Sequence, residues 1–260
     1  MKNQLTELLT NYGEIGGIWF DGYWDQTAPE GAADRTPRVD WHLPEIYALI
    51  HKLQPQCLIG NNHHLSPLPG EDFQMFERDL PGENKSGLSY QQASQQLPLE
   101  TCETINNSWG FNITDTTYKT PKQLIDYLVK ASGHDANFLL NIGPMPNGKI
   151  QPEFQERLAY MGRWLQVYGE SIYGTRAGMI RPQDWGCITQ KDNRVFVHIL
   201  KKGTGPIVID SFPYKKITRA SLLKDGTGVM AKIRDNRLTI TPAAWNKEDP
   251  DQVVVLEIAH

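Results

Sequence analysis

Acidic residues that could carry out acid–base chemistry lie in two places in the N-terminal part of the sequence. Asp21 ends the apolar run "EIGGIWFDG", which is typical of a buried parallel strand, and Gly22 leaves room for a ligand. Glu71, Glu77 and Glu83 follow in "GEDFQMFERDLPGEN". A carboxylate at a strand end is costly to bury unless it is used or paired. Asp21 could also cap the next helix, so the rest of the sequence has to decide.

Two carboxyl groups that flank a sugar can hydrolyse a glycosidic bond, one as nucleophile and the other as general acid and then base. Asp21 suits the nucleophile because a strand end holds it rigidly. The general acid needs apolar neighbours that raise its pKa. Phe73, Met75 and Phe76 supply such neighbours to Glu77. The alternative for each of the three glutamates is a surface carboxylate without a catalytic role.

The composition narrows the class of protein. The chain has 260 residues, a net charge of −4 and no apolar run of roughly 18 residues, so neither nucleic-acid binding nor a membrane span is expected. Seven tryptophans and ten tyrosines could stack on sugar rings or pack in a core. We interpret the widely spaced Cys57, Cys102 and Cys187 as buried thiols. No metal or cofactor is implied.

Strands and helices alternate over residues 1–175, a pattern that favours parallel βα units. Helices are expected at the N-terminus and at 43–55, 120–137 and 152–175; strands are expected at 14–21, 57–62, 100–112 and 138–144, with a Gly/Pro-rich loop at 63–87. Polar residues end successive strands, as in a (β/α)8 barrel, but only about four strands are expected. We therefore predict an α/β fold that is the C-terminal part of a (β/α)8-like barrel, with upstream strands missing.

From residue 176 the sequence consists of short β-branched runs separated by Gly, Pro, Asn and Asp. This pattern predicts an antiparallel β-sandwich, and "KDNR" and "RDN" are typical of hairpin turns. The predicted domains are therefore the barrel portion, 1–175, and the sandwich, 176–260.

Three segments carry a resemblance to a known family: "NYGEIGGIWFDG", "LPLETCETINNSWGFN" and "LLNIGPMPNGKIQPEFQERLAYMGRWLQVYGESIYGTR". In this order and spacing they resemble the family 29 glycoside hydrolases, the α-L-fucosidases, over roughly residues 5–176. The resemblance implies retaining hydrolysis of terminal α-L-fucosides through a covalent glycosyl-enzyme intermediate. It also implies a (β/α)8-like (TIM-type) barrel followed by a β-sandwich, and a fucosylated oligosaccharide or glycoconjugate as partner. The oligomeric state and the compartment are not indicated.

The resemblance assigns roles to individual carboxylates. Asp21 matches the family nucleophile, and Trp19 matches a tryptophan that lines the fucose pocket. The pattern "GDF.TPE" of many members best matches "EDFQMFE", which selects Glu77 as acid/base. Glu83 is the alternative, and Glu71 comes third.

The segment "NNHH" departs from the family pattern. Many members have Asn-Arg-His here, and Asn62 stands where the sugar-binding arginine is expected. His63 and His64 either bind substrate or form a structural pair, and "NNHH" lacks the further ligands that a metal needs. Trp109 either forms a wall of the pocket or packs at a helix start.

The half-barrel pattern bears on activity. An open half of a barrel exposes sheet edges and an apolar interior, so we expect the isolated chain to have little or no fucosidase activity. The alternative function is a non-catalytic remnant or carbohydrate-binding fragment of such an enzyme. Another retaining glycosidase, acting on galactose or a related sugar, is the third possibility.

Overall fold

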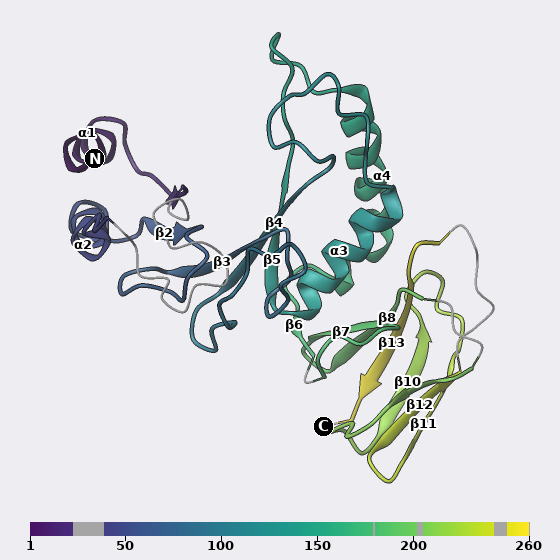
Figure 1. Cartoon of the computed structure of the whole chain (residues 1–260). Coiled ribbons are helices and arrows are strands. Elements are labelled where there is room, and N and C mark those ends of the chain that lie inside the picture. The colour runs from purple at the N-terminus through teal and green to yellow at the C-terminus, as the bar shows by residue number, and fades with distance from the viewer. Residues whose placement is uncertain (23–38, 179, 202–204, 242–248, 260) are drawn as a thin grey trace. The chain divides into compact units, whose positions relative to one another are not determined.

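A computed structural model describes residues 1–22, 39–178, 180–201, 205–241 and 249–259 (Figure 1). Its contacts divide the chain into two compact units, Met1–Glu103 and Thr104–His260, and each unit is described by itself. Within the described residues, no helix combines the length and the apolarity that a membrane crossing needs. The domain boundary predicted after residue 175 stays a prediction.

The described residues of the first unit form two helices and a parallel sheet. The helices are α1 (Lys2–Asn11) and α2 (Leu43–Leu53), and the strands are β1 (Gly17–Phe20), β2 (Leu58–Asn61), β3 (Phe73–Glu77) and β4 (Leu99–Thr104), whose last residue falls in the second unit. The strands pair in the order β1-β2-β3-β4, and every pair is parallel. This sheet fits part of a TIM-like barrel, as the sequence predicts.

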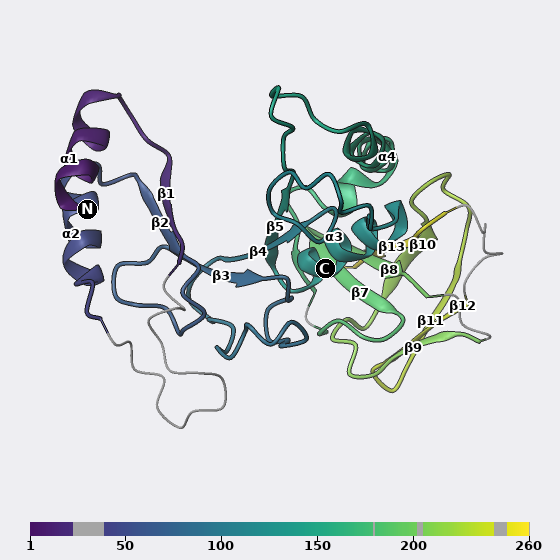
Figure 2. The same cartoon turned by 45° about the horizontal axis from the view of Figure 1, so that its top comes forward.

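A small core holds the helices of the first unit together. Figure 2 shows α1 and α2 side by side, and Leu5 and Leu9 of α1 are buried in a cluster with Ile46 and Ile50 of α2. The Gln54 amide, directly after α2, then holds the end of α1 and the loop that follows it, because its Nε2 donates to the Leu9 carbonyl at 2.7 Å and to the Gly13 carbonyl at 2.8 Å. The predicted amphipathic helix at the N-terminus is therefore confirmed.

Strand β3 is the element that the sequence analysis missed. Residues 63–87 were expected to form one long loop, and that expectation is wrong for Phe73–Glu77. Gly and Pro on both sides dominate the segment, yet Gln74, Met75 and Phe76 are buried between β2 and β4. Glu77 consequently lies at the end of a strand, not in a loop.

The second unit begins with two helices around a strand. These are α3 (Pro121–Gly133), β5 (Ala136–Asn141) and α4 (Pro152–Tyr168). Thr120 caps α3 as predicted, because its hydroxyl accepts from the Gln123 N–H and the Gln123 side chain accepts from the Thr120 N–H. The predicted helices and the strand of this region are thus confirmed, with shorter helices and with a strand that begins two residues earlier than predicted.

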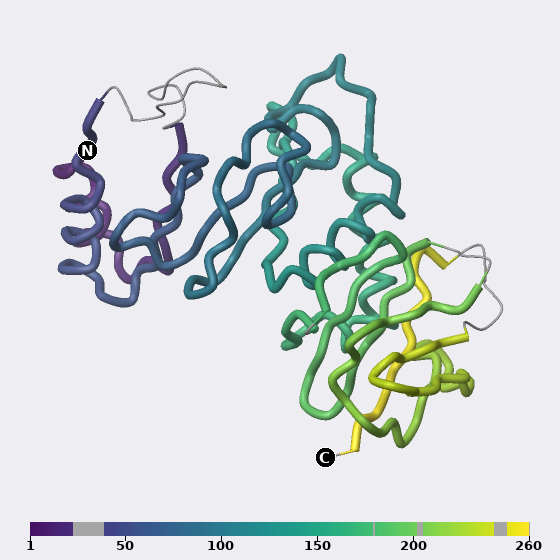
Figure 3. The backbone as a smooth tube through the Cα atoms, turned by 60° about the horizontal axis from the view of Figure 1, so that its bottom comes forward, coloured from purple at the N-terminus to yellow at the C-terminus, as the bar shows by residue number. Residues whose placement is uncertain are grey.

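Antiparallel strands make up the rest of the second unit, and Figure 3 shows β13 lying among earlier strands of this region. One sheet has the order β10-β13-β8-β7-β6 and the other β11-β12-β9. The strands are β6 (Arg176–Ala177), β7 (Gly186–Lys191), β8 (Arg194–Ile199), β9 (Ile207–Ile209), β10 (Ile217–Leu222), β11 (Met230–Arg234), β12 (Arg237–Thr241) and β13 (Gln252–Ile258). Both predicted hairpin turns are confirmed: β7 pairs with β8 and β11 with β12, and Asp192, Asp235 and Asn236 have positive φ.

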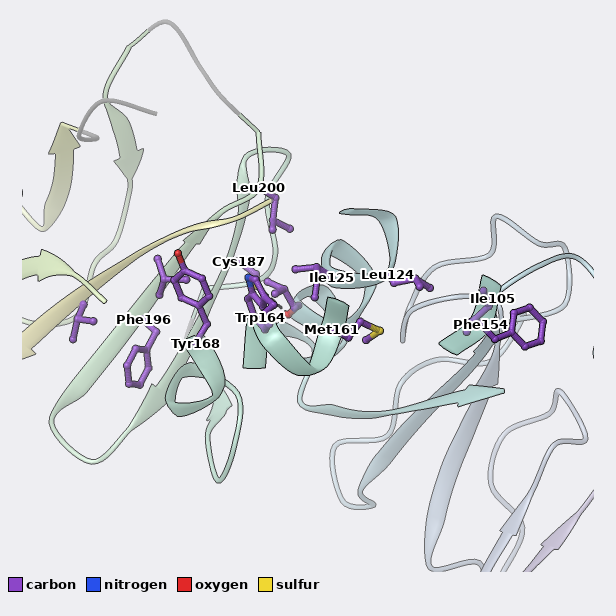
Figure 4. Close-up of a cluster of buried hydrophobic side chains, with 13 residues drawn as sticks. Ile105, Leu124, Ile125, Phe154, Met161, Trp164, Tyr168, Cys187, Phe196 and Leu200 are labelled. Atoms are coloured by element: carbon purple, nitrogen blue, oxygen red, sulfur yellow. Dashed lines mark hydrogen bonds between the residues drawn. The ribbon is translucent and has the colours of Figure 1, made fainter. Parts of the chain in front are cut away.

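Two apolar clusters fill the second unit. In the first cluster, shown in Figure 4, Leu124 and Ile125 of α3 and Trp164 of α4 share a core with Cys187 and Phe196 of the antiparallel sheet. The second cluster joins both antiparallel sheets through side chains such as Val197, Leu238 and Leu256. Cys57, Cys102 and Cys187 are all buried free thiols, as the sequence predicts.

Candidate active site

The candidate site lies at the carboxyl edge of the parallel sheet in the first unit. Phe20 pairs with Asn61, and Asn61 pairs with Gln74, so β1, β2 and β3 end at the same edge. The backbone N–H of Asn62 continues this ladder by donating to the Phe20 carbonyl at 2.9 Å. The residues that follow these strands are therefore brought together.

A single amide contacts both carboxylates that the sequence singled out. Asn62 Nδ2 lies 3.2 Å from Asp21 Oδ1 and 2.8 Å from Glu77 Oε2. Because both oxygens are hydrogen-bonded to one nitrogen, they lie no more than about 6 Å apart. This limit is compatible with the separation of about 5 Å between the two carboxyl groups of retaining glycosidases. Asn62 itself is buried, with 2% of its surface exposed.

Besides the hydrogen bond from Asn62, Glu77 accepts one from a histidine. His64 Nε2 lies 3.1 Å from the same oxygen, Glu77 Oε2. The hydrogen bond from His64 is the largest influence on Glu77 and holds the pKa of this carboxyl below its usual range; Asn62 acts in the same direction, against the opposing effect of burial. Glu77 is therefore a carboxylate near neutral pH. His64 has a φ of 59°, a conformation that is uncommon outside glycine.

Glu71 and His63 form a different, deeply buried pair. His63 Nε2 lies 2.8 Å from Glu71 Oε1, and the Tyr47 hydroxyl donates to the same oxygen at 3.0 Å. The Leu65 N–H donates to His63 Nδ1 at 2.9 Å, so Nε2 carries the proton of the neutral ring and donates to Glu71. The side chains of His63 and Glu71 are 3% and 1% exposed. The pair braces the loop after β2 from within.

Glu83, the alternative acid/base, has a different partner. Its Oε2 lies 2.7 Å from Lys85 Nζ in the loop after β3, and no contact with Asp21 is found for it in the described part of the chain. The contact geometry therefore favours Glu77, which shares Asn62 with Asp21.

Trp19 is 40% exposed on β1, two residues before Asp21. It forms a side-chain hydrogen bond with Glu100 of β4, and because an indole N–H can only donate, Glu100 is the acceptor. Burial raises the pKa of Glu100, and this hydrogen bond opposes the rise. The contact fixes the edge of a large aromatic face at the candidate site.

Trp109 lies in the second unit. Its side chain is 37% exposed, and its carbonyl accepts a hydrogen bond from Asn141 Nδ2 at 2.8 Å. Its predicted place in the sugar pocket stays a prediction.

Sequence reasoning missed two residues of this site. It took Asn62 as a replacement for an arginine and did not foresee that the amide bridges Asp21 and Glu77. It also gave Glu100 no place beside Trp19. The available signal for Asn62 was its position directly after a strand that neighbours the Asp21 strand.

A cysteine thiol and possible metal ligands are the other features that bear on the chemistry of this part of the chain. Burial raises the pKa of the Cys102 thiol to about 12, so this neighbour of Glu77 across the strands stays protonated and unreactive. Among the described residues, no group of three or more His, Cys, Asp or Glu side chains is arranged to hold a metal ion.

Parallel βα units with paired carboxylates at the strand ends define the broad class of the chain, and known proteins specify it further. The family model described as Alpha-L-fucosidase matches residues 1–170. An alpha-L-fucosidase from Branchiostoma floridae is 44% identical over 182 residues, which cover 66% of this chain and 36% of that protein.

Solved structures agree with the sequence match. Alpha-L-fucosidase isoenzyme 1 from Paenibacillus thiaminolyticus superposes with a TM-score of 0.78 at 33% identity, covering 100% of this chain and 62% of that one. A Bacteroides thetaiotaomicron alpha-L-fucosidase, solved as a trapped covalent intermediate, shares the fold with a TM-score of 0.77 at 22% identity.

The chain belongs to the alpha-L-fucosidase family. It covers less than two thirds of the length of the Branchiostoma and Paenibacillus relatives.

Proposed function

We propose that the chain supplies the two catalytic carboxylates of a retaining α-L-fucosidase that hydrolyses terminal α-L-fucosides of glycoconjugates. Asp21 is the nucleophile and forms the glycosyl-enzyme. Glu77 donates a proton to the leaving oxygen and then removes one from water. The observation that carries the proposal is that the Asn62 side-chain nitrogen, Nδ2, donates hydrogen bonds to both Asp21 Oδ1 and Glu77 Oε2.

The remaining predicted site residues have supporting roles in this proposal. Trp19 offers its exposed ring to the apolar face of the sugar, while Glu100 holds the indole in place. His64 holds Glu77, and His63 braces the loop that carries His64. We also propose that the two antiparallel sheets of the second unit form a β-sandwich, which the apolar cluster between them supports.

A second candidate function is a non-catalytic, carbohydrate-binding member of the family. One observation favours it: Asp21 is exposed at the carboxyl edge of the parallel sheet. In this case the Asp21–Asn62–Glu77 arrangement would bind fucose without cleaving it.

Hydrolysis of 4-nitrophenyl α-L-fucoside by the purified chain separates the two functions. An active chain should lose at least about 100-fold in kcat with Asp21→Ala. The wild-type chain should form a covalent adduct on the peptide containing Asp21 when it is incubated with 2-fluoro-fucosyl fluoride, as measured by mass spectrometry. Binding of fucose without turnover and without an adduct would instead favour the non-catalytic function.

A further inference from the structure

The hydrogen bonds around Glu77 raise a question about where its proton comes from. A general acid must carry a proton before it can protonate the leaving oxygen. Glu77 Oε2 instead accepts from two donors, Asn62 Nδ2 at 2.8 Å and His64 Nε2 at 3.1 Å. Both contacts stabilise the carboxylate, and the pKa of Glu77 is lowered accordingly. This environment suits the base of the second step better than the acid of the first.

The two donors differ in what they can do with a proton. An amide N–H does not titrate, so Asn62 can only hold Glu77 in place. An imidazole titrates near neutral pH and can pass a proton along an existing hydrogen bond. His64 is 4% exposed, so its ring is shielded from bulk solvent, and its contact with Glu77 provides a direct route.

We propose that His64 is the proton store of the acid/base pair, holding the proton that Glu77 gives to the leaving group and taking back the proton that Glu77 removes from water. The proposal rests on the proposed function. In the first step the proton moves from His64 Nε2 to Glu77 Oε2 and on to the glycosidic oxygen, while the bond from this oxygen to the sugar breaks and Asp21 bonds to the sugar. In the second step water attacks, the Asp21 bond breaks, and the water proton returns through Glu77 to His64.

Several charged groups lie near this pair, among them Glu100 and Glu103, which act on Cys102, the partner of Glu77 on β4. Asp21, directly after β1, also contacts the Asn62 amide, and Arg78, which follows Glu77, acts on Glu77 as a cation. Cys102 on β4 is a neutral thiol. The neighbouring His63–Glu71 pair has hydrogen bonds to Tyr47 and Leu65. The left-handed backbone at His64 is a conformation of the kind that concentrates at functional sites.

The leaving group provides the test for an active chain. His64→Gln keeps a side-chain N–H that can hold Glu77 but cannot store a proton. On a fucosyl disaccharide, whose leaving alcohol needs protonation, kcat/KM should fall by about 100-fold. On 4-nitrophenyl α-L-fucoside, whose leaving group needs little protonation, it should fall less than about threefold. Equal losses on both substrates, or no loss on either, would overturn the proposal.

A matched control and a second readout complete the experiment. His51→Gln alters another histidine–carboxylate pair, that of His51 and Asp72, and should leave kcat/KM unchanged on both substrates. The ¹⁵N resonances of the His64 ring should differ between the wild type and Glu77→Gln, because the variant lacks the carboxylate with which the ring shares its proton. An identical ring state in the two proteins would contradict the proposal. If the wild type hydrolyses neither substrate, the proposed function fails. The ¹⁵N measurement alone then shows whether His64 and Glu77 share a proton.

Discussion

Glu100 is the residue whose environment conflicts with its charge. It lies on β4, where burial raises the pKa of its carboxyl group despite the hydrogen bond from Trp19. For an acid, a raised pKa in the folded state means that ionisation is more costly there than in the unfolded chain. The free energy of unfolding therefore loses a contribution as the pH rises through the carboxyl range.

Glu100→Gln should remove this cost while keeping an oxygen that accepts from the Trp19 indole. We expect the melting temperature of the variant to exceed that of the wild type at about pH 7, and the two to agree at about pH 4, where the wild-type carboxyl is protonated. Thermal unfolding followed by circular dichroism measures the difference. Glu14→Gln, at an exposed position, is the control and should show no such pH dependence. A lower melting temperature for Glu100→Gln at both pH values would contradict this account.

At the scale of an element, the contact between β2 and β3 depends on the absence of a side chain. Gly60 pairs with Phe73, and the Phe73 ring lies directly over Gly60. A Cβ added at residue 60 would lie 2.1 Å from Phe73 Cζ, far inside van der Waals contact. The ring therefore occupies the space that a side chain on β2 would fill.

Gly60→Ala should lower the free energy of unfolding by about 1–3 kcal/mol, because the Phe73 ring has to move out of its place. Urea unfolding measures the change. Gly16→Ala is the matched control, since a Cβ there meets nothing within 4 Å. Adding Phe73→Leu to Gly60→Ala should recover part of the loss, and strictly additive effects would argue against the contact as the cause.

The elements that could be predicted from the sequence are those with strong local signals. The Thr120 cap of α3 and the turns at Asp192 and Asp235 follow from side-chain chemistry within a few residues. Strand β3 could not be predicted, because its short buried run is flanked by Gly and Pro. For the candidate site, the strand end predicted Asp21 as a functional carboxylate, whereas the bridge through Asn62 depends on the register between three strands, which no local pattern encodes.

At the scale of the whole molecule, the second unit combines helices and antiparallel sheet in one core. Phe196 of β8 is fully buried in the same cluster as Leu124 of α3 and Trp164 of α4. The predicted boundary after residue 175 would separate elements that share this cluster. Shared apolar burial makes such elements unfold together.

Phe196→Ala should therefore destabilise α3, α4 and the antiparallel strands by the same amount, about 3–5 kcal/mol. Native-state hydrogen exchange measures the loss at each amide. Val208→Ala, at a strand position that is 46% exposed, is the control and should change protection little. Retained protection in α3 and α4 with loss confined to the strands would support a boundary near residue 175.

The bridging amide also bears on how the protein ages. Hydrolysis of the Asn62 side chain during storage would convert it to aspartate and leave an anion between Asp21 and Glu77, where the amide now donates to both. Three negative groups at such short range repel one another and would spread apart or capture protons. A deamidated preparation would then show a distorted candidate site in an otherwise intact fold, so the arrangement of this site would be lost in storage before the fold is.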